Sequence, residues 1–241
     1  MSLNVFEVNF WEGLSFINFA ILLSAANILM FLSTGVIVFL LRKYFIQFDL
    51  NSDETKMSRR DYFLSTLVLV VNINVGLLGW SLMNQGIISL DSKPLSLIGF
   101  DALLLFLLID WGMYFAHFLT HKTFLYKLTH AIHHEHESMG TLSLYVMHPV
   151  EAFGFGVILL SLLSVYSIDI TALLIFLFLN WILGVFAHSG IEPSKGRLAN
   201  YICMTRFHQI HHENPNFNFG FYTPFLDMLF KTRYYKLKKE L

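Results

Sequence analysis

Two stretches of the chain, residues 13–41 and 62–90, contain no charged residue. A helix that crosses the hydrocarbon core of a bilayer needs about 20 consecutive apolar residues, so each stretch is long enough. A soluble amphipathic helix would carry a polar face at helical period, and neither stretch does. The whole chain has only 14% charged residues, whereas a soluble domain typically has about 25%. Both stretches are therefore predicted to span a membrane.

Two further apolar stretches follow. Residues 94–119 contain Asp101 and Asp110 and predict a third span. Residues 152–187 are too long for one helix and are interrupted by SVYSID at 164–169, which predicts a membrane hairpin of two arms. The expected fold class is an all-α, multi-pass integral membrane protein with about three transmembrane helices, a membrane hairpin and a cytoplasmic helical cap that carries a histidine-bound dimetal site.

The chain is expected to form a single membrane domain over residues 1–241. Residues 1–109 are mainly anchor spans, residues 110–232 hold the histidine-rich region, and residues 233–241 form a basic tail. The first apolar stretch has no basic residue before it and is too long for a cleaved signal peptide, so it is expected to remain as an anchor.

The distribution of lysine and arginine predicts the orientation. The loop at 42–61 has five of the 16 basic residues, the loop at 84–93 has one, and the other ten follow the third span. With the N-terminus outside, 15 of them lie on one side, which is the cytoplasm by the positive-inside rule. The expected location is the inner membrane in a bacterium or the endoplasmic reticulum in a eukaryote.

All eleven histidines follow residue 116 and are expected at that cytoplasmic surface. One pair is spaced i, i+4 and two triplets have the HxxHH pattern, so imidazoles share a helix face and can converge on a metal about 2.0–2.1 Å away. His148 and His188 are placed where the hairpin enters and leaves the membrane, while His136 fits a solvated turn better. The candidate ligands are His117, His121, His130, His133, His134, His148, His188, His208, His211 and His212.

Ten imidazoles are too many for one ion and suit two ions with four or five ligands each. Imidazole binds iron, zinc, copper and nickel, so the ligands alone do not identify the metal. The lone Cys203 excludes a cysteine-based cluster, and the HExxH zinc-protease motif is absent.

Five motifs lie within about residues 110–232: DWGMYFAHFLTH, LYKLTHAIHHE, MHPVE, AHSG and FHQIHHENPNFNFGFYTPFLDMLFKT. They resemble motifs of the sterol desaturase/fatty acid hydroxylase superfamily, and LYKLTHAIHHE is most similar to the form found in sterol 4-methyl oxidases. The resemblance implies that the ten histidines bind two iron ions, which zinc or nickel can replace in a purified form. Gly184 stands where some members have a further histidine, which favours His148 as a ligand.

The resemblance further implies an O2-dependent enzyme that hydroxylates or desaturates a lipid, of sterol or fatty acyl type. Spans two to four are expected to form an apolar slot, with Tyr145, Trp111 and Trp181 as candidate lining residues. Asp110 is expected to accept a hydrogen bond from a ligand histidine, or alternatively from Asn72, Asn74 or Asn180. Asp101 is expected to be solvated near the outer surface.

The sequence lacks dinucleotide, haem-attachment and iron–sulfur motifs, so an external electron donor is expected, such as a small cytochrome or ferredoxin with its reductase. A basic tail could bind this donor or anionic membrane lipids, and binding to lipids is favoured. Its residues are Lys231, Arg233, Lys236, Lys238 and Lys239. No nucleic-acid partner is expected.

Two other functions fit parts of the pattern. A membrane-embedded zinc hydrolase of a lipid ester or amide would use the same ligands, and metal content and oxygen dependence would distinguish it. A transporter or metal sensor would place histidines at mid-membrane depth along a path, whereas these gather at one surface.

Overall fold

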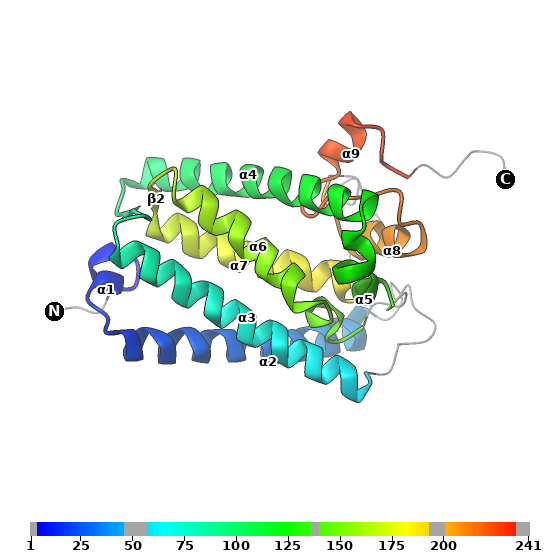
Figure 1. The fold of residues 1–241 in the computed structure, drawn as a ribbon, viewed down its shortest axis with the longest axis horizontal. Coiled ribbons are helices and arrows are strands. Elements are labelled where there is room, and N and C mark those ends of the chain that lie inside the picture. The colour runs from blue at the N-terminus through cyan, green and yellow to red at the C-terminus, as the bar shows by residue number, and fades with distance from the viewer. Residues whose placement is uncertain (1–3, 46–56, 136–139, 193–200, 235–241) are drawn as a thin grey trace.

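The computed structural model describes residues 4–45, 57–135, 140–192 and 201–234. Long helices lie side by side along its long axis, with short helices at both ends (Figure 1). The elements are α1 (Val8–Glu12), α2 (Phe16–Phe45), α3 (Arg59–Asn84), β1 (Leu90–Asp91), α4 (Leu95–Lys122), the π-helical turn η2 (Tyr126–His130), α5 (Ala131–His134), the 3-10 turn η3 (Ser143–Tyr145), α6 (Pro149–Leu163), β2 (Ile168–Asp169), α7 (Ile170–His188), α8 (Thr205–Glu213) and α9 (Phe225–Leu229).

Four helices, α2, α3, α4 and α7, are long and apolar enough to cross a membrane. They confirm the three predicted spans, and α6 with α7 confirms the predicted hairpin. The turn of the hairpin forms where Asp169 accepts hydrogen bonds from the backbone N–H groups of Thr171 and Ala172 and so caps α7. Many large apolar side chains on the outside of the bundle remain exposed, as expected of surfaces that face lipid.

Glycines allow the helices to approach closely. A Cβ atom at Gly76 of α3 would lie 2.7 Å from Leu23 Cδ2 of α2, and one at Gly156 of α6 would lie 2.5 Å from Val75 Cγ1 of α3. Small residues at such contacts are typical of membrane helix packing because they let the helices touch over their backbones. These contacts fix the depths at which α2, α3 and α6 face one another.

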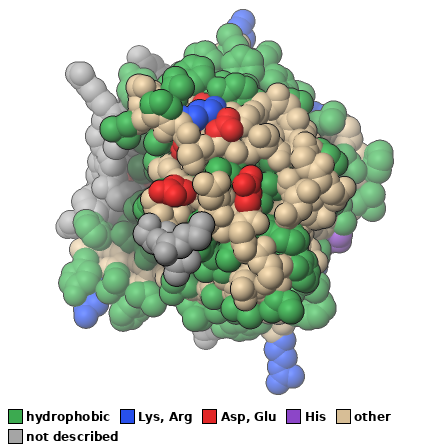
Figure 2. Space-filling view, turned by 90° about the vertical axis from the view of Figure 1, so that its left-hand side faces the viewer, with side chains coloured by type: hydrophobic (Ala, Val, Ile, Leu, Met, Phe, Trp, Pro, Cys, Tyr) green, Lys and Arg blue, Asp and Glu red, His purple; other side chains and the backbone are tan. Residues whose placement is uncertain are grey.

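A polar network closes the end of the bundle that carries α1. Strands β1 and β2 pair in parallel there, and Asp101 is fully buried. The Lys93 ammonium lies 2.8 Å from the Asp101 carboxylate, which also accepts from Tyr166 and from the N–H of Asp169. The expectation that Asp101 is merely solvated is therefore wrong. Figure 2 looks onto this end and shows acidic and basic side chains near its middle, with apolar side chains around them.

The opposite end carries α5, α8 and α9 (Figure 1). Arg60 at the start of α3 forms an ion pair of 2.7 Å with Glu135, directly after α5, so the start of α3 lies beside the histidine-rich helices. Ser58 and Asp61 form a capping box that starts α3 there. Arg60 and the described histidines thus share one end, as the sequence predicts, whereas Lys93 lies at the other; the compartment that the histidine end faces remains a prediction.

Candidate metal centre

Nine of the ten candidate histidines come together at one end of the helix bundle. We define a first histidine group, whose ligand atoms all lie within 4.8 Å of one another, as His117, His121, His130, His134 and His211. A second histidine group, defined in the same way, contains His133, His188 and His208. His212 joins the second group, because its Nε2 lies 3.1 Å from His208 Nε2 and 3.3 Å from His133 Nε2.

Each HxxHH triplet is divided between the two groups. His130 and His134 belong to the first group, whereas His133 belongs to the second. In α8 the division is reversed, since His211 belongs to the first group and its neighbours to the second. The HxxHH spacing predicts one helix face for each triplet and does not predict this division. It ties the two groups together and keeps them adjacent, as a pair of ions requires.

The second ring nitrogen of several histidines is fixed by a backbone carbonyl. Nδ1 of His117 lies 2.9 Å from the Phe219 oxygen, and Nδ1 of His188 lies 3.0 Å from the Gly184 oxygen. His133 and His211 have the same arrangement. A carbonyl oxygen only accepts, so in each ring Nδ1 carries the proton and Nε2 presents its lone pair.

The distances between Nε2 atoms fit a bound metal. His133 and His188 both present Nε2 lone pairs 3.5 Å apart, which is a repulsive contact unless a cation lies between them. Two nitrogens about 2.1 Å from one ion, at about 90–110° to each other, are separated by about 3.0–3.4 Å. Five Nε2–Nε2 separations within the two groups lie between 3.0 and 3.5 Å. In the described part of the chain, the buried His211 Nε2 has no hydrogen-bond partner, so it too is available to a metal.

Four of the histidine rings on the short helices α5 and α8 are neutral at physiological pH. Burial lowers the pKa of His134 to about 3 and holds the pKa values of His208, His211 and His212 well below 6.5. Charge on neighbouring imidazoles lowers them further. Neutral imidazole is the form that binds metal.

A carboxylate and a C-terminal loop orient these rings. Glu151, in the first turn of α6, lies 2.7 Å from His130 Nδ1. Asp227 of α9 accepts from the N–H groups of Phe219 and Gly220, and so holds the carbonyl that fixes His117. Neither role is predicted from the sequence, although Glu151 lies in the MHPVE motif and Asp227 in the motif that ends in FLDMLFKT.

Asp110 has a different partner from those expected. Its carboxylate accepts from the Tyr222 N–H at 2.9 Å and from the Thr223 hydroxyl at 2.6 Å. Both versions of the expectation, a ligand histidine or an asparagine, are therefore wrong. Asp110 anchors the C-terminal loop to α4, and the carboxylate beside a ring nitrogen is Glu151.

His148 lies outside both histidine groups. It occupies the N-cap of α6, where its Nδ1 accepts from the Val150 N–H at 3.2 Å. Its assignment as a ligand remains a prediction from the sequence. His136 and three basic tail residues, Lys236, Lys238 and Lys239, lie outside the described residues.

A cavity of about 670 Å³ extends from the histidines into the bundle. Both Ile170 and His188, at the two ends of α7, line it, so it follows that helix for about 27 Å at 1.5 Å per residue. Tyr145 and Trp181 line it as predicted, whereas Trp111 is not among the lining residues and is 45% exposed. Most of the wall is apolar. It is formed by the spans predicted to line it together with α2, which was not part of that prediction.

A model of the fatty acid hydroxylase family matches residues 102–232, which is more than half of the chain and includes every candidate ligand. The chain belongs to this family. The resemblance to the sterol desaturase/fatty acid hydroxylase superfamily is thereby confirmed.

Two relatives of this member of the fatty acid hydroxylase family have names that describe sterol-modifying enzymes. A Dictyostelium discoideum protein named as a methylsterol monooxygenase is 30% identical over 140 residues, 56% of this chain and 51% of the relative. A Delta(7)-sterol-C5(6)-desaturase of Nicotiana tabacum is 32% identical over 135 residues, 52% of this chain and 46% of the relative. The chain spans about half the length of the curated relatives it matches. No solved structure gives a significant match.

Proposed function

We propose that this protein hydroxylates or desaturates an unactivated C–H position of a lipid, using O2 and external electrons at two histidine-bound iron ions. The observation that carries the proposal is the position of nine imidazoles at one end of a long apolar cavity within a membrane-spanning bundle. The names of the relatives, a sterol monooxygenase and a sterol desaturase, support the same reaction class.

The geometry suits this chemistry. Bound iron would supply an oxidant for O2-dependent cleavage of a C–H bond, which acid–base groups alone do not attack. The cavity wall holds a hydrocarbon and excludes water. The carbonyls at Nδ1 keep the rings in the tautomer that directs Nε2 inward, and Glu151 does the same for His130. The chain's own residues therefore bind and orient, and the reducing electrons come from a separate donor.

Localisation follows from the same assignment. We propose that the histidine end of the bundle lies at the cytoplasmic surface. Basic residues at this end support the proposal by the positive-inside rule, and one of them, Arg60, pairs with Glu135. A lipid then reaches the cavity from the bilayer, and a soluble or peripheral electron donor reaches the metal end from the cytoplasm.

The test is lipid mass spectrometry of cells that express the wild type or His211→Ala. We expect lipids that have gained one oxygen atom or lost two hydrogen atoms in the wild type alone, and only with oxygen present. A product that forms equally under anaerobic conditions would contradict the proposal and favour the zinc hydrolase. Metal analysis of protein prepared without added metal should find iron, about two ions per chain by the ligand number.

A further inference from the structure

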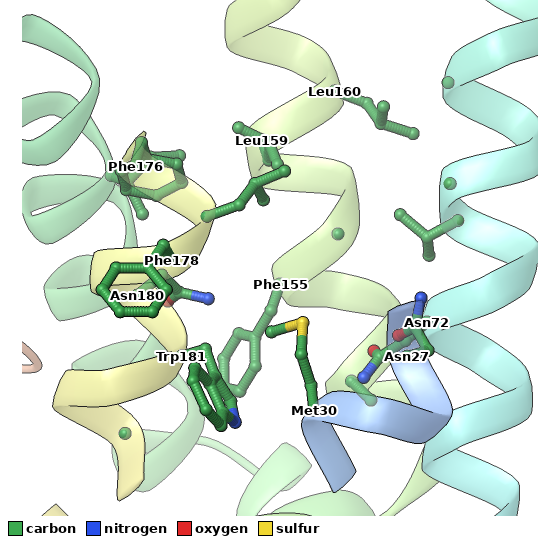
Figure 3. A pocket seen from close by; sticks show the side chains of 18 of the residues that line it. Asn27, Met30, Asn72, Phe155, Leu159, Leu160, Phe176, Phe178, Asn180 and Trp181 are labelled. Carbon is green, nitrogen blue, oxygen red and sulfur yellow. The ribbon is translucent and has the colours of Figure 1, made fainter. Parts of the chain in front are cut away.

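Three asparagines line the cavity within the membrane-spanning helices: Asn27 on α2, Asn72 on α3 and Asn180 on α7. An amide in hydrocarbon is costly unless its hydrogen bonds are made, so polar side chains at this depth commonly serve a ligand or a helix contact. Figure 3 shows Asn27 and Asn72 on one wall of the cavity, across from Asn180 and Trp181. The amides therefore interrupt a wall otherwise shaped for a hydrocarbon.

Asn27 and Asn72 face each other across the α2–α3 contact. Leu23 of α2 packs on Gly76 of α3, as the 2.7 Å approach to a Cβ there shows. The two helices run in opposite directions (Figure 1). Asn27 is four residues after Leu23, and Asn72 is four residues before Gly76. One helical turn on both helices, toward the histidine end, therefore brings the two amides opposite each other.

These amides keep free hydrogen-bonding groups. Asn27 Nδ2 donates to the Leu23 carbonyl at 2.9 Å, which leaves its Oδ1 as an acceptor. Among the described residues, Asn72 has no hydrogen-bond partner, so its donor and its acceptor both remain open. Asn74, two positions along α3, is exposed, donates to the Val70 carbonyl and does not line the cavity.

We propose that Asn27 and Asn72 form a hydroxyl-binding subsite, and that the lipid held in the cavity is an alcohol. A hydroxyl both donates and accepts, so it can accept from Asn72 Nδ2 and donate to the Asn27 oxygen. A hydrocarbon or an ether would leave at least one of these amide groups unpaired, which weakens its binding. The inference rests on the proposed function in that the cavity takes a lipid, and it adds the class of that lipid.

The depth of the subsite is set by helix contacts. On α3, Asn72 is three residues before Val75. Val75 touches Gly156 of α6. Gly156 in turn is five residues after Glu151. Because α3 and α6 run in the same direction, Asn72 and Glu151 differ in depth by about 3 Å at 1.5 Å per residue. The hydroxyl is therefore held on the α2–α3 wall at nearly the depth of the histidines.

The experiment measures lipid retention by the purified full-length protein, without reductant. The protein is incubated in micelles with equimolar cholestanol and cholestane, and separately with octadecanol and octadecane, and the retained lipids are quantified by mass spectrometry. We expect the wild type to retain one alcohol over its hydrocarbon by about tenfold or more. Asn72→Leu and Asn27→Leu, which keep the side-chain volume nearly constant, should lose this preference. Asn74→Leu, the matched control on α3, should keep it.

Several results would overturn the subsite. They are retention of neither alcohol by the wild type, equal retention of alcohol and hydrocarbon, or a preference that survives in both Asn72→Leu and Asn27→Leu. A preference lost equally in Asn74→Leu would also overturn it. No turnover is needed, so discrimination without any oxidised product in cells would support the subsite and contradict only the proposed oxidation.

Discussion

Nδ1 of His130 lies 2.7 Å from a carboxylate oxygen of Glu151, and both side chains are almost fully buried. The contact joins the π-helical turn η2 to the first turn of α6. It leaves His130 Nε2 directed at the first histidine group, 3.0 Å from His117 Nε2. A carboxylate on the outer nitrogen raises the basicity of the inner one and holds the ring in place.

The first prediction concerns this carboxylate. Glu151→Gln keeps the size of the side chain but replaces the carboxyl group beside His130 Nδ1 with an amide, so metal affinity should fall by about ten- to a hundredfold, as is usual for such partners of ligand histidines. Metal content after dialysis against a graded series of chelator concentrations measures the change. Glu135→Gln, an exposed carboxylate paired with Arg60, is the control and should bind metal as the wild type does. Equal affinities in the two variants would contradict the assignment.

Sequence reasoning succeeded where the signal is periodic and failed where it depends on tertiary contacts. Uncharged stretches predict spans because bilayer thickness sets their length. The repeated histidine spacing predicts eight of the nine side chains that converge, and the end of the membrane hairpin predicts the ninth, His188. The division of each triplet between two groups depends on how α5 and α8 meet, which no local pattern encodes. The partners of Asp110 were missed for the same reason, since Tyr222 follows it by 112 positions.

The second prediction concerns Asp110 as an anchor. Asp110→Asn weakens the bonds to the Tyr222 N–H and the Thr223 hydroxyl, so the free energy of unfolding should fall by about 1–3 kcal/mol. Denaturant titration in micelles measures this loss. Metal affinity should fall less than in Glu151→Gln, because no ligand ring contacts Asp110 among the described hydrogen bonds. A large loss of metal affinity with little loss of stability would show that Asp110 has a direct role at the metal centre instead.

The third prediction tests His148 as a ligand. Asparagine caps helices well, so His148→Asn retains the N-cap of α6 while it removes the imidazole. We expect metal content and stability close to those of the wild type, because His148 lies outside both histidine groups. Loss of one ion per chain in this variant would instead establish His148 as the tenth ligand.

The fourth prediction concerns pH. Burial lowers the pKa values of His134, His208, His211 and His212 in the folded protein, whereas unfolded histidines keep pKa values of about 6.5. Protonation therefore favours the unfolded chain. The stability contributed by these rings is complete above about pH 6.5 and is lost as the pH falls below it. Thermal unfolding of the chelator-treated protein should show a midpoint that is constant from pH 8 to about 7 and then declines toward pH 5. A midpoint that rises over that lower range would contradict the burial of neutral rings.

The last prediction compares two glycines of α6. A Cβ at Gly156 would lie 2.5 Å from Val75 Cγ1, and the branched valine has little freedom to move away. Gly156→Ala should therefore separate α3 from α6 and destabilise the protein by about 1–3 kcal/mol. Gly154 has no atom within 4 Å of a built Cβ, so Gly154→Ala should be neutral or stabilise the helix by up to about 1 kcal/mol. Unfolding in micelles measures both variants.

The same contact sets the depth of Asn72 relative to Glu151. Gly156→Ala should therefore also reduce the retention of lipid alcohol, while Gly154→Ala should leave that retention unchanged. Equal stability of the two variants would mean that α3 and α6 do not pack at this depth.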